Sequence, residues 1–90
     1  KYVAVKQDDT HLSAKYSRVL KDGFVSMDKA QNILVIKTVS GMAMAVAAAV
    51  DAMEMEEIVG SIAGDDTIMA AVRSNEDVEA VMKKIYAVLG

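Results

Sequence analysis

The pattern of hydrophobic and polar positions changes its period several times along the chain, and each change marks a new element. Apolar residues recur at helical spacing from Leu12 to Leu20 and predict a first helix. The polar run Asp8–Thr10 offers N-cap candidates before it, and Gly23 is a candidate C-terminal stop. Tyr2–Val5 is expected to form a short extended arm that precedes this helix.

The middle of the chain reads as a β-hairpin followed by a helix. Two strand-like segments, Phe24–Met27 and Ile33–Val39, flank a polar turn at Asp28–Asn32. The alanine-rich stretch Met42–Met53 then favours a helix, and it is apolar on all sides until Asp51. A helix of that kind is normally buried all round. Because one sheet in a small two-layer domain cannot cover it completely, we expect its uncovered face to meet another subunit.

The C-terminal third repeats the hairpin and helix pattern. Ile58–Ala63 and Thr67–Arg73 flank a turn at Gly64–Asp66. Ser74 is placed to cap a last helix, with Asp77 at the capping-box position. A single apolar stripe on this helix consists of Val78, Val81, Met82, Ile85 and Leu89.

Elements in the order α-ββ-α-ββ-α predict an α+β fold over residues 1–90. The expected architecture is a two-layer sandwich, in which a four-stranded antiparallel sheet carries its helices on one face. Apolar residues make up 53% of the 90 residues. A domain of this size buries only about 60% of the surface that its unfolded chain exposes. The apolar excess therefore predicts a homo-oligomer, because obligate interfaces resemble a core cut in half.

Charge and residue content exclude several classes of protein. The formal net charge is -3 and the basic residues form no stripe, so the chain alone is a poor candidate for binding nucleic acid. There is no cysteine, which excludes disulfides and thiolate metal sites. The apolar run Met42–Val50 is too short to cross a bilayer. The start at Lys1, without a signal peptide, suggests a fragment of a longer, cytoplasmic protein.

The candidate chemistry is concentrated in the turn that contains Asp65 and Asp66. Adjacent carboxylates raise one another's pKa unless a cation lies between them, so the pair predicts a metal ion, a basic side chain or a cationic ligand. Ordinary turn formation also explains the composition Gly-Asp-Asp, and Asp51 alone reads as a solvated charge at a helix end. A carboxylate pair can hold Mg²⁺. The single histidine and the lack of a recognisable nucleophile–base pair argue against an enzyme.

Four segments, taken in order, resemble the C-terminal domain of bacterial arginine repressors. They are Ile33–Thr38, the Gly-x-Ala at residues 41–43, Asp51, and the run Gly60–Ile68 (GSIAGDDTI), which is the most specific of the four. The resemblance implies an L-arginine-binding domain of a regulator of arginine metabolism that assembles as a hexamer, a dimer of trimers. Arginine, the co-repressor, would lie between the trimers, with no metal or other cofactor. DNA would be bound only by a separate N-terminal winged helix-turn-helix domain that residues 1–90 lack.

Carried over by position, Asp65 and Asp66 match the arginine-binding aspartates of this family. Asp51 matches a further acidic position at the end of the central helix, and Ser61 and Ala63 match positions that line the site.

Two positions depart from the family pattern. Ser40 stands where the family usually has proline, and Met44 stands in the ligand site where the family often has glutamine. A thioether cannot donate a hydrogen bond and accepts one only weakly. An oligomerisation scaffold that does not use arginine is therefore the alternative hypothesis.

Overall fold

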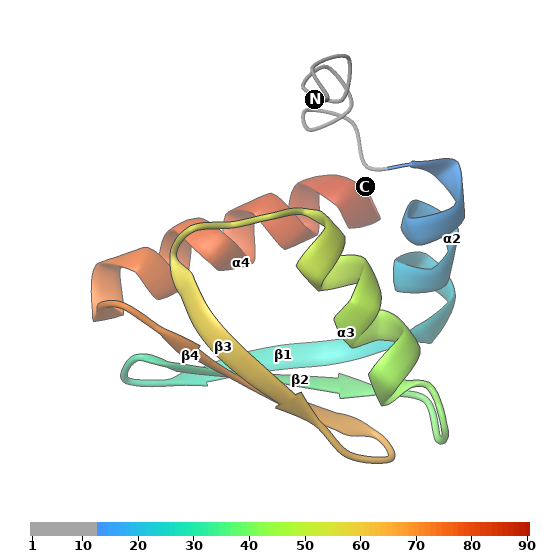
Figure 1. Ribbon diagram of the computed structural model, residues 1–90, viewed down its shortest axis with the longest axis horizontal. Helices are drawn as coiled ribbons and strands as arrows, with labels where there is room; N and C mark the ends of the chain where they lie inside the picture. The colour runs from blue at the N-terminus through green and yellow to red at the C-terminus, as the bar shows by residue number, and fades with distance from the viewer. Residues whose placement is uncertain (1–12) are drawn as a thin grey trace.

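The computed structural model describes residues 13–90, which form the predicted α+β two-layer sandwich (Figure 1). The predicted arm Tyr2–Val5 and the capping candidates Asp8–Thr10 lie outside this range. The elements, in chain order, are α2 (Ala14–Gly23), β1 (Phe24–Ala30), β2 (Ile33–Thr38), α3 (Ala43–Ala52), β3 (Ile58–Ala63), β4 (Thr67–Val72) and α4 (Asn75–Leu89).

The sheet has four antiparallel strands in the order β1-β2-β4-β3, so the second hairpin joins the first through the pairing of β2 with β4. Alternate residues of these two central strands are buried, as a sheet covered on one face requires. The helices lie on that face (Figure 1). The largest fully buried side chains between the two layers are Leu20, Leu34, Ile36, Ile68, Ile85, Val46, Val72, Val78 and Val81.

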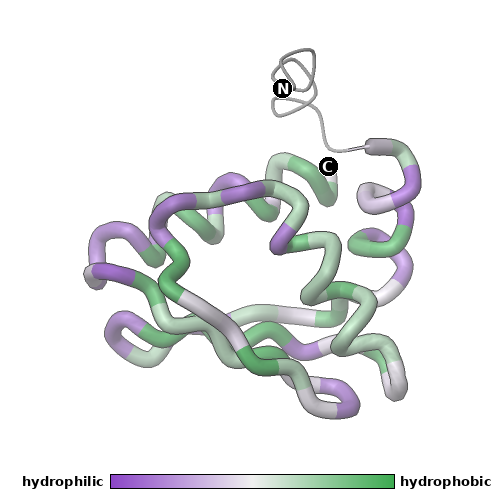
Figure 2. Tube along the Cα trace, in the orientation of Figure 1, coloured by the Kyte–Doolittle hydropathy of each residue, from purple (hydrophilic) through white to green (hydrophobic). Residues whose placement is uncertain are grey.

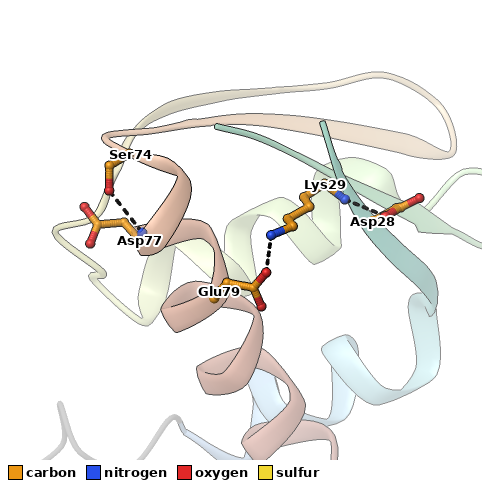
Figure 3. A network of polar contacts seen from close by, with 5 residues as sticks. All are labelled: Asp28, Lys29, Ser74, Asp77 and Glu79. Atoms are coloured by element: carbon orange, nitrogen blue, oxygen red, sulfur yellow. Dashed lines mark hydrogen bonds and ion pairs between the residues drawn. The ribbon is translucent and has the colours of Figure 1, made fainter. Parts of the chain in front are cut away.

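Helix α4 has a capped start and is joined to the sheet along one face. Ser74 is the N-cap, as predicted, and its Oγ accepts a hydrogen bond of 3.1 Å from the amide of Asp77 (Figure 3). Glu79 forms an ion pair with Lys29 of β1, which connects the helix to the outer strand. The predicted apolar stripe is confirmed, because its central members face the core with no exposed surface.

Gly23 ends α2 as predicted, but for a different physical reason. It is absent from the positions with a positive φ, so it does not act as a left-handed C-cap. A Cβ atom on Gly23 would lie 2.6 Å from Cγ2 of Val46 in α3. Glycine is therefore needed here because the two helices approach each other closely.

Two predicted boundaries are wrong. Helix α2 is capped by Ser13, whose Oγ accepts from the amide of Tyr16 at 3.4 Å, and not by Asp8–Thr10. The first turn consists of Gln31 and Asn32 alone, because β1 continues through Ala30 where a turn from residue 28 onward was predicted. The extension places Lys29 opposite α4, where it forms its ion pair. The predicted bounds of β2, α3, β3 and β4 are correct to within one residue.

Candidate functional site

The turn between β3 and β4 is fixed against the start of α3 by the backbone of Asp65. Its carbonyl oxygen accepts hydrogen bonds from the amides of Gly41 at 3.1 Å and Ala43 at 3.2 Å. The side chain of Met42, the N-cap residue of α3, accepts no hydrogen bond from the first amides of the helix. The carbonyl oxygen of Asp65 accepts one in its place. Gly41 has a φ of 82°, a left-handed conformation that favours glycine. Asp65 is thus held at the end of α3 where the helix dipole favours a negative charge.

Among residues 13–90, each of the two paired carboxylates accepts one hydrogen bond from a hydroxyl group. Ser40 Oγ donates to Oδ2 of Asp65 at 3.1 Å. Thr67 Oγ1 donates to Oδ1 of Asp66 at 2.9 Å, and it accepts from the Lys37 ammonium at 3.0 Å. Both aspartates are exposed. An ionised carboxylate has about four lone-pair positions. Both carboxylates therefore retain room for a cationic partner.

The cation that the sequence predicted beside the aspartates is present only indirectly. Lys37 reaches the Thr67 hydroxyl, and within residues 13–90 neither Asp65 nor Asp66 forms an ion pair. The same range holds no cluster of three or more histidine, cysteine, aspartate or glutamate side chains placed to bind a metal ion. The arrangement suits a cationic organic ligand that supplies several N–H donors of its own.

Nothing local in the sequence marks Lys37 and Thr67 as neighbours of the aspartates, and Ser40 stands out only as a departure from the family pattern. Lys37 and Thr67 are directly paired across β2 and β4, so only the sheet register shows that they lie together beside the turn. No local motif carries this information, since the pairing depends on which strands meet.

The predicted site residues of α3 lie on its uncovered face. Met44, Ala48 and Asp51 follow the i, i+4, i+7 spacing of one helical stripe, and all three are exposed, Met44 by 72%. Figure 2 shows that the helix is hydrophobic over most of its length and hydrophilic at its far end. Asp51 lies eight residues beyond Ala43, or about 12 Å along the axis. One protomer therefore does not bring Asp51 to the Asp65–Asp66 pair.

The predicted site residues of β3 lie on the helix side of the sheet. Ser61 is paired with Ala70, and Ala63 with Ile68, and both partners are buried beneath the helices. Ser61 itself is exposed, because β3 is an edge strand. Strand β3 runs beside α3 back to the turn (Figure 1). Met44, Asp51, Ser61 and Ala63 thus lie along α3 and β3, and the turn that carries Asp65 and Asp66 lies at one end of these two elements.

The centre of the opposite face of the sheet is apolar and uncovered. Ile62 and Met69, which are paired across β3 and β4 on this face, are 78% and 53% exposed. Together with Ile33, Gly60 and Ala71 they line an open hollow of about 580 Å³. Sheet faces of soluble proteins are covered or polar as a rule, so this surface is a candidate interface.

A second hollow, of about 780 Å³, lies between α4 and the loop before β3. It contains none of the six predicted site residues. Lys84 Nζ donates to Oε2 of Glu57 at 2.7 Å, and this hydrogen bond lowers the pKa of the Glu57 carboxyl. Arg73 Nε donates to the Glu56 carbonyl oxygen at 3.0 Å. These contacts fix the loop to α4 and the end of β4.

The helices between residues 13 and 90 are all too short or too polar to cross a membrane.

Comparisons with known proteins agree on one family. The family model described as Arginine repressor, C-terminal domain, matches residues 20–87. A protein of Lachnospira eligens named Arginine repressor is 64% identical over 85 residues, or 94% of this chain and 56% of that relative. The Arginine repressor of Lachnoclostridium phytofermentans is 60% identical with the same coverage.

A protein of the same name from Bacillus licheniformis is 43% identical over 76 residues, which cover 84% of this chain and 51% of the relative. The chain therefore spans about half the length of these curated relatives. From the extent of the family match and the level of identity, we conclude that the chain belongs to the arginine repressor C-terminal domain family.

Proposed function

We propose that this chain is the arginine-sensing oligomerisation domain of a cytoplasmic regulator of arginine metabolism. Its family consists of transcription regulators, which agrees with the prediction that it is not an enzyme. The observation that carries the proposal is the exposed pair Asp65 and Asp66, held at the amino-terminal end of α3 with free acceptor positions. A separate domain would bind DNA.

The chemistry of arginine fits this pair of carboxylates. The guanidinium group presents a planar fork of N–H donors that matches carboxylate oxygens. Arginine has two positive groups, whereas Asp51, Asp65 and Asp66 offer three negative ones, and Asp51 lies about 12 Å along α3 from the other two. One ligand of this size reaches all three charges only if different protomers supply them. We therefore place arginine between subunits.

Two uncovered surfaces support assembly through two interfaces. One is the apolar face of the sheet around Ile62 and Met69, and the other is the stripe of α3 that contains Met44 and Ala48. A dimer of trimers needs two different contacts of this kind. Arginine that binds the hexamer better than the trimer shifts assembly by that difference in affinity. The geometry of the DNA-binding domains would then follow the assembly state.

A scaffold that assembles without arginine is the second candidate. It is favoured by Met44, which is 72% exposed beside the proposed ligand and has no hydrogen-bond donor in its side chain. Equal hexamer stability at zero and at millimolar arginine would support the scaffold.

Calorimetric titration with L-arginine tests the proposal. We expect the parent to bind L-arginine and to bind the uncharged analogue L-citrulline much more weakly, because citrulline lacks the guanidinium charge. The double variant Asp65→Asn/Asp66→Asn should lose binding. The variant Asp22→Asn/Asp28→Asn, which removes the same charge from two other exposed aspartates, should bind as the parent does. Parent-like binding by the Asp65/Asp66 variant would show that the site is assigned wrongly.

A further inference from the structure

Two hydroxyl side chains hold the paired carboxylates, one on each aspartate. Ser40 lies in the connection between β2 and α3, and Thr67 is the first residue of β4. We propose that Ser40 and Thr67 are positioning residues, which orient Asp65 and Asp66 for the guanidinium group of the ligand. This inference rests on the proposed function and adds two residues to the site.

The direction of the hydrogen bonds at Thr67 is fixed by chemistry. The Lys37 ammonium has only donors, so the Thr67 oxygen must accept from it and must give its own proton to Asp66. Lys37 thereby brings a positive charge near the Asp66 carboxylate without pairing directly with it. Within residues 13–90 the second oxygen of Asp66, Oδ2, receives no hydrogen bond, so it is left to the ligand.

Ser40 has the corresponding role at Asp65. Its hydroxyl donates to Oδ2, while the amide of the next residue, Gly41, donates to the Asp65 carbonyl. The same short connection therefore fixes both the backbone and the side chain of Asp65. The other carboxylate oxygen, Oδ1, accepts no hydrogen bond from the described residues. A carboxylate oriented in advance binds more tightly, by about twofold to tenfold for each ordered side chain.

Four variants that keep both aspartates test the inference. Ser40→Ala and Thr67→Val remove the hydroxyl groups, and valine keeps the shape and the strand preference of threonine. We expect each to raise the dissociation constant for L-arginine by about twofold to tenfold. Ser40→Thr and Thr67→Ser keep a hydroxyl and should retain most of the affinity. Ser26→Ala, which removes an exposed hydroxyl from β1, serves as the matched control.

Thermal unfolding without arginine separates orientation from folding. Both hydrogen bonds are exposed, so the ligand-free midpoint should change by no more than that of Ser26→Ala. If the parent binds arginine and Ser40→Ala and Thr67→Val bind it equally well, the inference is wrong and the proposed function stands. Equal losses in the rescue variants, or losses that follow the thermal midpoint, would also overturn it. A parent that does not bind arginine refutes both.

Discussion

Replacing Gly23 by alanine is expected to destabilise the protein, although alanine is the better helix former. The added Cβ would lie 2.6 Å from Cγ2 of Val46 and 3.1 Å from Cε of Met42. Overpacking of this kind costs about 1–3 kcal/mol. The gain from replacing glycine is about 0.5–1 kcal/mol inside a helix, and smaller at the last position. The clash therefore outweighs the gain, and we expect Gly23→Ala to lower the free energy of unfolding by roughly 1–2 kcal/mol.

Urea unfolding and thermal unfolding at fixed protein concentration measure this loss. A destabilisation of that size lowers the midpoint of a domain this small by about 4–16 °C. The double variant Gly23→Ala/Val46→Ala removes the atom that clashes, so its loss should be smaller than the sum of the two single losses. A Gly23→Ala variant as stable as the parent would refute the close crossing of α2 and α3. That crossing also holds the helix that carries Met44 and Asp51.

The remaining predictions concern α3, the loop before β3 and the start of α4. Ala48→Glu should leave the fold intact but weaken assembly in sedimentation, because it buries an unpaired charge at the proposed interface, whereas Ala49→Glu, at a fully buried position, should unfold the protein. A hexamer that tolerates Ala48→Glu would exclude this face as an interface. The pKa of Glu57 is lowered by Lys84, so their ion pair stabilises the fold above about pH 4.5 and loses this effect as the pH falls through the lowered pKa. With Lys84 half-exposed the contribution is at most about 1 kcal/mol. In acid unfolding, the stability of the Glu57→Gln variant should lack that part of the pH dependence. An acid unfolding curve identical to that of the parent would contradict this prediction. Ser74→Ala should cost about 1 kcal/mol in urea unfolding through loss of the N-cap of α4, and an unchanged midpoint would mean that the cap is not needed.

Patterns of residues close together in the sequence were sufficient to predict most of the fold. The stripe from Val78 to Ile85 and the cap at Ser74 define α4, because both depend on residues close in sequence. The end of β1 could not be predicted in this way. Asp28 and Asn32 favour turns, yet the strand continues through Ala30, because Asp28, Lys29 and Ala30 are paired with residues of β2. The ion pair that Lys29 then forms with Glu79, 50 residues later, has no local signal in the sequence.

The candidate site, like the fold, was predictable only where it depends on residues close together in the sequence. The adjacent pair Asp65 and Asp66 is visible in the sequence, because two neighbouring carboxylates predict a cationic partner. The donors to them are not visible, since Ser40 lies 25 residues from Asp65 and Lys37 lies 30 residues from Thr67. Only the pairing of β2 with β4 brings these residues together.

Sedimentation velocity of the parent chain, with and without L-arginine, tests arginine-linked assembly most directly. We expect saturating arginine to convert trimers into hexamers, and L-citrulline at the same concentration to leave the distribution unchanged. The Asp65→Asn/Asp66→Asn variant should not respond to either ligand. An identical distribution of species in the parent with and without arginine would contradict the proposal that arginine controls assembly.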